Sequence, residues 1–170
     1  EFDMFLIPQD AAERNVVELL NPITENLSIM RTLMAPAMVR VIENNIKNGN
    51  EAMRFFEIAN VYLPKALPLT EPPVEKKMIC LGTCGIKEDF FSMKAALEAF
   101  ASANDLEFTY KRGNVPYLHP GRTADVYCKD VKIGHFGQLR YEIVDSMNIA
   151  GGKKADTKIF IAEIDYATLA

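Results

Sequence analysis

Apolar side chains between residues 30 and 50 recur at the spacing of an α-helix. The stripe consists of Met34, Met38, Val41 or Ile42, and Ile46. A stripe of this kind is typical of a helix that packs one face against a core or a partner. Thr32 can cap the start of the helix, Pro36 is tolerated in its first turn, and Gly49 can end it. The pattern predicts a helix from about residue 33 to residue 48.

The next segment, residues 53–63, carries apolar side chains on both alternate faces. Aromatic and β-branched residues such as Phe55, Phe56 and Ile58 are typical of a central strand whose two faces are both covered. Four prolines follow between Leu63 and Pro73. Because proline cannot donate to a strand ladder, these residues predict a long loop.

The rest of the chain contains more predicted strands than helices. The further strands are predicted at residues 15–20, 77–83, 106–111, 123–129, 131–139 and 159–164. The further helices are predicted at residues 89–104 and 141–147. Lys129 and Asp130 form the turn of a hairpin between two of the strands. This order predicts an α+β fold, with an antiparallel or mixed β-sheet flanked by helices that pack on one face.

Composition narrows the class of protein. The chain has 170 residues, 49% hydrophobic and 25% charged, which suits one soluble globular domain. Its three cysteines are an odd number, so a reducing cytoplasm is expected rather than a secreted disulfide framework. No apolar run approaches the length of a membrane helix. A net charge of −4 predicts weak binding to nucleic acid by this chain alone.

The start of the chain differs from the rest. It begins at Glu1 without methionine, and residues 1–18 show no cap and no clear period. We therefore expect a piece of a longer protein, in which residues 1–18 are a partial lead-in to a single domain spanning residues 1–170. The glycine- and lysine-rich residues 151–154 predict a surface loop rather than a domain linker.

The segment from His119 to Arg122 is the most site-like cluster. A titratable ring and a guanidinium lie beside Pro120 and Gly121, as in a binding loop. The alternative is a structural turn in which His119 and Arg122 satisfy nearby carbonyls or carboxylates. A lone histidine and arginine specify no reaction.

Glu57 interrupts the apolar strand and is expected to be partly buried, so it needs a partner. Arg31, Arg122 or a group from a second chain could provide one, and a structural ion pair is favoured over a catalytic acid. Cys80 and Cys84 fall on one strand face and are expected to be buried thiols rather than metal ligands. Met34 and Met38 either fill the core or form a partner surface.

Four segments in this order resemble the beta subunit of bacterial phenylalanyl-tRNA synthetases. They are NPITENLSIMRT at residues 21–32, RFFEI at residues 54–58, DFFSMK at residues 89–94 and HPGRTA at residues 119–124. The resemblance runs from about Leu19 to the end of the chain. One departure is GQLRY at residues 137–141, where the family usually has a sequence closer to GELHP.

The resemblance implies a class II aminoacyl-tRNA synthetase-like core that has lost catalysis. It also implies assembly with the catalytic alpha subunit, two chains of each kind, in an enzyme that uses ATP and magnesium and acts on tRNA. No GxGxGxxR segment, which holds ATP in class II sites, occurs in this chain, so no cofactor is expected here. The residues expected to be structural or to contact the alpha subunit are Arg31, Met34, Met38, Glu57, His119 and Arg122. If the surface that contacts the alpha subunit is exposed, the isolated chain is expected to self-associate.

Two other classes of protein stay open. The first is an enzyme in its own right, with His119, Arg122 and Glu57 around a pocket for a small acidic substrate. The second is an RNA-contacting module, which the negative charge disfavours.

Overall fold

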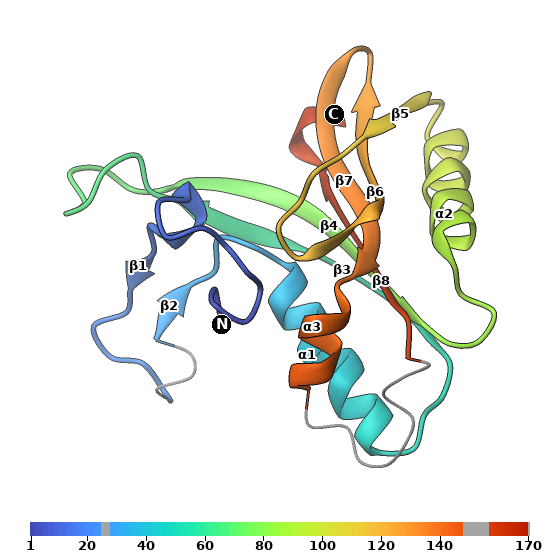
Figure 1. Cartoon of the computed structure of the whole chain (residues 1–170). Coiled ribbons are helices and arrows are strands. Elements are labelled where there is room, and N and C mark those ends of the chain that lie inside the picture. The colour runs from blue at the N-terminus through green and yellow to red at the C-terminus, as the bar shows by residue number, and fades with distance from the viewer. Residues whose placement is uncertain (25–27, 148–156, 170) are drawn as a thin grey trace.

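The computed structural model of the protein describes residues 1–24, 28–147 and 157–169. Its main element is a six-stranded sheet in the order β3-β4-β8-β7-β6-β5, in which all neighbours are antiparallel (Figure 1). The strands are β3 (Met53–Leu63), β4 (Val74–Cys84), β5 (Phe108–Arg112), β6 (Leu118–Cys128), β7 (Val131–Leu139) and β8 (Ile159–Asp165). The helices are α1 (Ala35–Lys47), α2 (Phe90–Ala103) and α3 (Tyr141–Ser146). The predicted α+β class is confirmed.

Smaller elements flank this sheet. A two-stranded sheet pairs β1 (Val17–Glu18) with β2 (Ile29–Met30), so the strand predicted at residues 15–20 is much shorter than expected. Short 3₁₀ turns occur at Ala12–Arg14 and Ala167–Leu169. The strand predicted at residues 77–83 extends at both ends to become β4.

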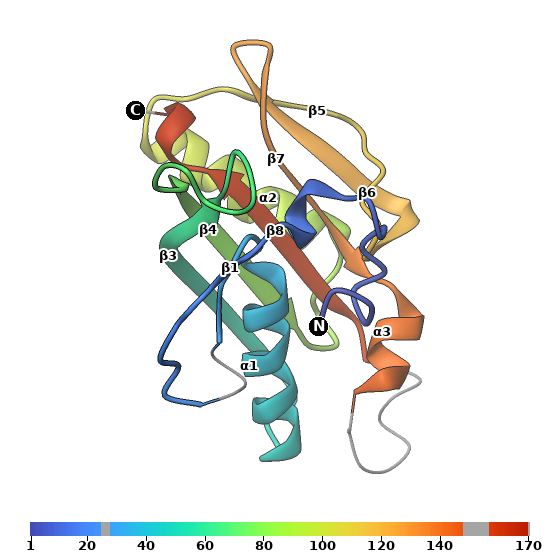
Figure 2. The same cartoon turned by 90° about the vertical axis from the view of Figure 1, so that its left-hand side faces the viewer.

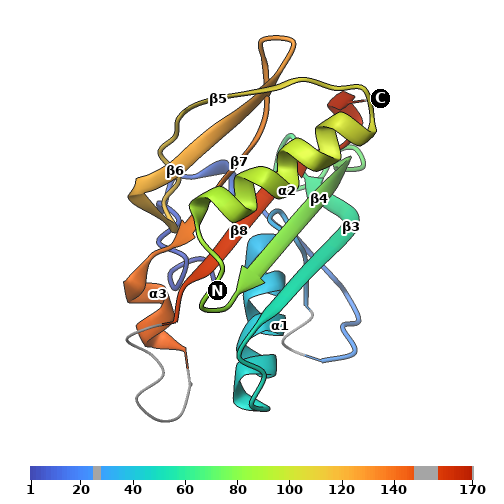
Figure 3. The same ribbon diagram turned by 90° about the vertical axis from the view of Figure 1, so that its right-hand side faces the viewer.

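The helices cover both faces of the sheet, so the prediction that they pack on one face is wrong. Helix α1 lies on one face and α2 on the other (Figures 2 and 3). Met38 and Ile42 of α1 join one core cluster, whereas Met93 and Leu97 of α2 join a second. Every residue of β8 is buried, because this strand runs between the two layers. Because the inner strands carry apolar residues on both faces, each face of the sheet has to be covered by a helix.

Strand β3 is an edge strand, which corrects its prediction as a central strand. Among the described residues its one strand neighbour is β4, and α2 does not cover this edge of the sheet (Figure 3). Phe56 and Ile58 are 74% and 52% exposed on the α2 face. Phe55 instead packs against the cluster beneath α1. The apolar residues of β3 therefore lie in two environments: those on the α1 face pack against the core, and those on the α2 face are exposed.

The start of α1 also differs from its prediction. The Thr32 hydroxyl donates to the Glu13 carbonyl at 2.5 Å and does not cap the helix. Pro36 does lie in the first turn, as expected. At the other end Gly49 has a φ of +87° and its N–H donates to the Ile46 carbonyl at 3.0 Å. Glycine tolerates this left-handed backbone, so its predicted role at the helix end is confirmed.

Other local predictions have mixed outcomes. Residues 64–73 form the expected loop between β3 and β4, and α2 begins with a capping box between Asp89 and Ser92. His119 to Arg122 is no turn, because these residues lie inside β6, where its pairing with β7 shifts between Leu118 and Thr123. The predicted loop at residues 151–154 lies outside the described residues. Within the described chain, no helix is long and apolar enough to span a membrane.

Candidate functional site

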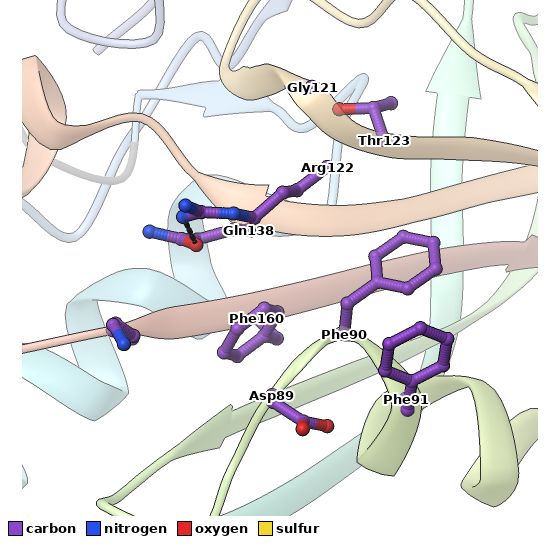
Figure 4. Close-up of a pocket in the computed structure, with 9 residues that line it drawn as sticks. Asp89, Phe90, Phe91, Gly121, Arg122, Thr123, Gln138 and Phe160 are labelled. Carbon is purple, nitrogen blue, oxygen red and sulfur yellow. Dashed lines mark hydrogen bonds between the residues drawn. The ribbon is translucent and has the colours of Figure 1, made fainter.

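A cavity of about 490 Å³ opens where the start of α2 faces the sheet. Its lining consists of Asp89, Phe90, Phe91, Gly121, Arg122, Thr123, Gln138, Lys158 and Phe160. Figure 4 shows Arg122 and Gln138 on one side and the rings of Phe90 and Phe91 on the other, with Phe160 between them. Four elements therefore build the cavity: α2, β6, β7 and the beginning of β8.

Arg122 is the polar centre of this cavity. Its Nη1 donates to the Oε1 of Gln138 and, at 3.1 Å, to the hydroxyl of Tyr141. The hydrogen bond from Arg122 is the main reason that the pKa of Tyr141 lies below its ordinary value. Gln138 is only 1% exposed, so β7 holds the acceptor that orients Arg122. Arg122 therefore lines a cavity, and its role in binding or in structure stays a prediction.

His119 lies close by but does not line the cavity. Its Nδ1 accepts a hydrogen bond from the Gly121 N–H at 3.1 Å, and its carbonyl accepts one from the Thr123 hydroxyl at 2.7 Å. Its ring contacts that of Tyr141 edge to face, with the centroids 5.9 Å apart. These contacts stabilise the irregular part of β6. They support the structural role for His119 rather than a role in binding.

Glu57 is separated from both of these residues. It forms an ion pair with Arg31, whose Nη1 lies 2.9 Å from its Oε1, and both side chains are partly exposed. Arg31 also donates from Nε to the Asn60 carbonyl at 3.1 Å. Strands β4, β8 and β7 lie between β3, which carries Glu57, and β6, which carries Arg122. His119, Arg122 and Glu57 therefore do not form a common site.

Met34 and Met38 are buried in the core of this chain. Their contacts within the chain support the structural role rather than a partner surface. Cys80, Cys84 and Cys128 are free and buried, and burial raises the pKa of Cys84 to about 11. A thiol of this kind is a poor nucleophile. The described residues contain no group of three or more potential metal ligands.

Glu163 is a buried carboxyl group that was not among the residues predicted from the sequence. It is 2% exposed in β8, and its Oε1 accepts hydrogen bonds from the N–H groups of Met34, at 3.0 Å, and Ala35. It therefore caps α1 from the opposite end of the chain. Desolvation raises its pKa to about 7, although the two backbone donors act in the other direction. A lone carboxylate within the apolar run from Ile159 to Ile164 was the available signal.

A buried polar pair accompanies Glu163. The Tyr117 hydroxyl and the His135 Nε2 are 2.6 Å apart. Desolvation lowers the pKa of His135 to about 4, and Lys132 adds to this effect. Desolvation also raises the pKa of Tyr117, and the charge of Glu163 adds to it. All three groups are thus biased towards their neutral forms.

We expect Glu163→Gln to make stability more sensitive to acid. The pKa of Glu163 rises from 4.5 to about 7 on folding, so its contribution to stability falls as the pH rises through this range. The pKa of His135 falls from 6.5 to about 4, so its contribution falls as the pH drops. The two effects oppose each other in wild type. In Glu163→Gln, the free energy of unfolding at pH 4.5, taken relative to that at pH 7, should be about 3 kcal/mol lower than in wild type.

Urea unfolding at half-unit pH steps would measure this difference. Lys129→Gln, at the exposed tip of the β6–β7 hairpin, is the control and should follow the wild-type profile. Parallel profiles for wild type and Glu163→Gln would show that Glu163 does not titrate in this range.

Residues 1–166 match the family model described as the phenylalanyl tRNA synthetase beta chain CLM domain. The phenylalanine–tRNA ligase beta subunit of Clostridium acetobutylicum is 30% identical over 171 residues, which cover 99% of this chain and 20% of the relative. That of Clostridium tetani is 32% identical over 170 residues, with the same coverage.

A third relative is the phenylalanine–tRNA ligase beta subunit of Xylella fastidiosa, strain Temecula1. It is 32% identical over 144 residues, covering 78% of this chain and 18% of the relative. The chain thus spans about a fifth of the length of these relatives. The family resemblance noted in the sequence is confirmed. The chain belongs to the family of phenylalanyl-tRNA synthetase beta chain CLM domains.

Proposed function

We propose that this chain is the catalytically silent, class II synthetase-like domain of a phenylalanyl-tRNA synthetase beta subunit. It supports the attachment of phenylalanine to tRNA by assembling with the catalytic alpha subunit, two chains of each kind, in the cytoplasm. The assembled enzyme uses ATP and magnesium in the alpha subunit and binds tRNA. This domain binds neither cofactor and contributes the shape and position of its surface.

The observation that carries the proposal is the separation of the candidate reactive groups. Glu57 is paired with Arg31 at one edge of the sheet, whereas Arg122 lies several strands away. In the cavity, Asp89 is the one carboxylate among the described lining residues, and its Oδ1 accepts a hydrogen bond from the Ser92 N–H at 2.7 Å. It therefore serves as a helix cap. No acid, base and nucleophile come together there, as hydrolysis or acyl transfer would require.

The open edge of the sheet is our candidate for the contact with the alpha subunit. Strand β3 has 11 residues, and among the described residues its outer edge is hydrogen-bonded to Arg31 at Asn60 and Tyr62 but has no strand partner at Phe56 and Ile58. Long exposed edges are usually covered in native proteins. Phe56 and Ile58 form the rim of an apolar groove of about 240 Å³. The remaining lining residues are Ile79, Leu81, Leu97, Phe100 and Ile164. Because the relatives are beta subunits, we propose that an alpha subunit covers this groove.

We expect Ile58→Asp to weaken assembly. A carboxylate in a buried apolar interface would lose its hydration without gaining a partner, so the affinity should fall about 100-fold. Co-expression of the full beta chain with a tagged alpha subunit, followed by quantification of the copurified beta chain, would measure the effect. Phe56→Asp should behave in the same way.

Ile86→Asp is the matched control, because Ile86 is fully exposed in the loop between β4 and α2. It should copurify as wild type does. Met38→Glu does not test the contact with the alpha subunit, because it would place a charge in the core and destabilise the chain itself. Full copurification of Ile58→Asp would rule out this groove as the contact and favour another part of the beta chain as its cover.

A further inference from the structure

Two cationic side chains in the cavity beside α2 have no carboxylate partner within the described chain. Arg122 donates to Gln138 and Tyr141, and both acceptors are neutral. Lys158 is exposed directly before β8 and takes part in no ion pair among the described residues. Its charge also contributes to the lowered pKa of Tyr141. The cavity therefore has a surplus of positive charge on this side.

The guanidinium of Arg122 is held in one orientation. Its Nη1 is occupied by two acceptors, one of which is the buried amide of Gln138. Its Nε and Nη2 have no hydrogen-bond partner in the part of the chain that the structure describes. This edge of a guanidinium binds a carboxylate or phosphate through two parallel hydrogen bonds. Because Arg122 is exposed and lines the cavity, this donor pair is accessible to a ligand there.

The other side of the cavity is aromatic. The rings of Phe90 and Phe91 meet edge to face, with their centroids 5.7 Å apart, and Phe91 is 72% exposed. Phe160 lies between these rings and Arg122 (Figure 4). A flat apolar group would bury the exposed ring and stack beside it. The volume of about 490 Å³ is within the range of small-molecule sites.

We propose that this cavity binds a small anion with an aromatic body. Its carboxylate or phosphate lies on the free edge of Arg122 and beside Lys158, and its ring lies against Phe90 and Phe91. Binding requires no reacting group, so the proposal goes beyond the silent scaffold role and does not depend on it.

The test uses the assembled enzyme, with full-length beta chains. Two fluorinated anions, 3-(4-fluorophenyl)propanoate and 4-fluorophenyl phosphate, are titrated by ¹⁹F NMR, with 3-(4-fluorophenyl)propanamide as the neutral analogue. At least one anion should occupy one site per beta chain, and Arg122→Gln should weaken that site at least about tenfold. Lys158→Gln should weaken it less, and Lys129→Gln should leave it unchanged.

The variants separate charge from geometry. Arg122→Lys keeps the charge but loses the donor pair, so its affinity should lie between those of wild type and Arg122→Gln. Any binding to the alpha subunit is common to all variants and cancels in the comparison. Equal binding by wild type, Arg122→Gln and Lys158→Gln would overturn the proposal, as would equal binding of the neutral amide. Copurification of Arg122→Gln with the alpha subunit should be unaffected, so a failure here is distinct from a failure of the assembly model.

Discussion

Glu163→Ala is expected to reduce the free energy of unfolding by about 4 kcal/mol. The substitution removes the acceptor for the N–H groups of Met34 and Ala35, which are both buried. Each unpaired buried donor costs about 1–3 kcal/mol, and the cavity left by the side chain adds to this. The loss is a large part of the stability of a typical domain. Urea denaturation monitored by circular dichroism would measure it at pH 7.

Glu163→Gln is the control for this prediction. Its amide oxygen can accept the same two hydrogen bonds without bearing a charge, so at pH 7 its stability should lie within about 1 kcal/mol of wild type. A loss as large as that of Glu163→Ala would mean that the charge, rather than the acceptor, stabilises the start of α1.

Gly134→Ala is expected to cost at least about 4 kcal/mol or to prevent folding. A Cβ at this position would lie 2.1 Å from the Glu163 carbonyl oxygen and 2.9 Å from the Ile164 Cδ1. Strand β7 is paired with β8 on one side and β6 on the other, so it cannot move away without breaking a ladder. The clash also involves the backbone of Glu163, whose side chain caps α1. Soluble yield and the urea midpoint would measure the effect.

Gly121→Ala is the matched control. Its added Cβ would approach only the His119 ring, at 3.4 Å, and the position is exposed. Its stability should lie within about 0.5 kcal/mol of wild type. If the two glycine variants unfold alike, β7 and β8 do not approach as closely at Gly134 as the structure indicates.

Local patterns were sufficient for most of the elements. The stripe through Met34, Met38 and Ile42 predicted α1, and these side chains are buried. The prolines after Leu63 predicted the loop before β4. Such signals depend on neighbours within a few residues, which the sequence displays directly. Thr32 shows the limit of this approach, since it has the chemistry of a cap but bonds to Glu13 instead.

The candidate site was predicted only in part. Arg122, which was predicted either to belong to a binding loop or to be structural, lines the cavity, whereas Glu57, its partner in the enzyme alternative, lies at the far edge of the sheet. Gln138 of β7 and Lys158, directly before β8, complete the cavity. Their side chains carry no motif, because their role depends on strands that pair across long sequence separations.

The sequence by itself determined the family, the α+β class and the positions of the main helices and strands. These features depend on ordered motifs, apolar periods and turn residues, which are local properties of the chain. Only the tertiary structure decided that β3 lies at the edge, that the helices cover both faces, and that Glu163 caps α1 from 128 residues away along the chain. These features depend on strand order and on hydrogen bonds between residues that are far apart along the chain. Neither produces a repeating pattern in the sequence.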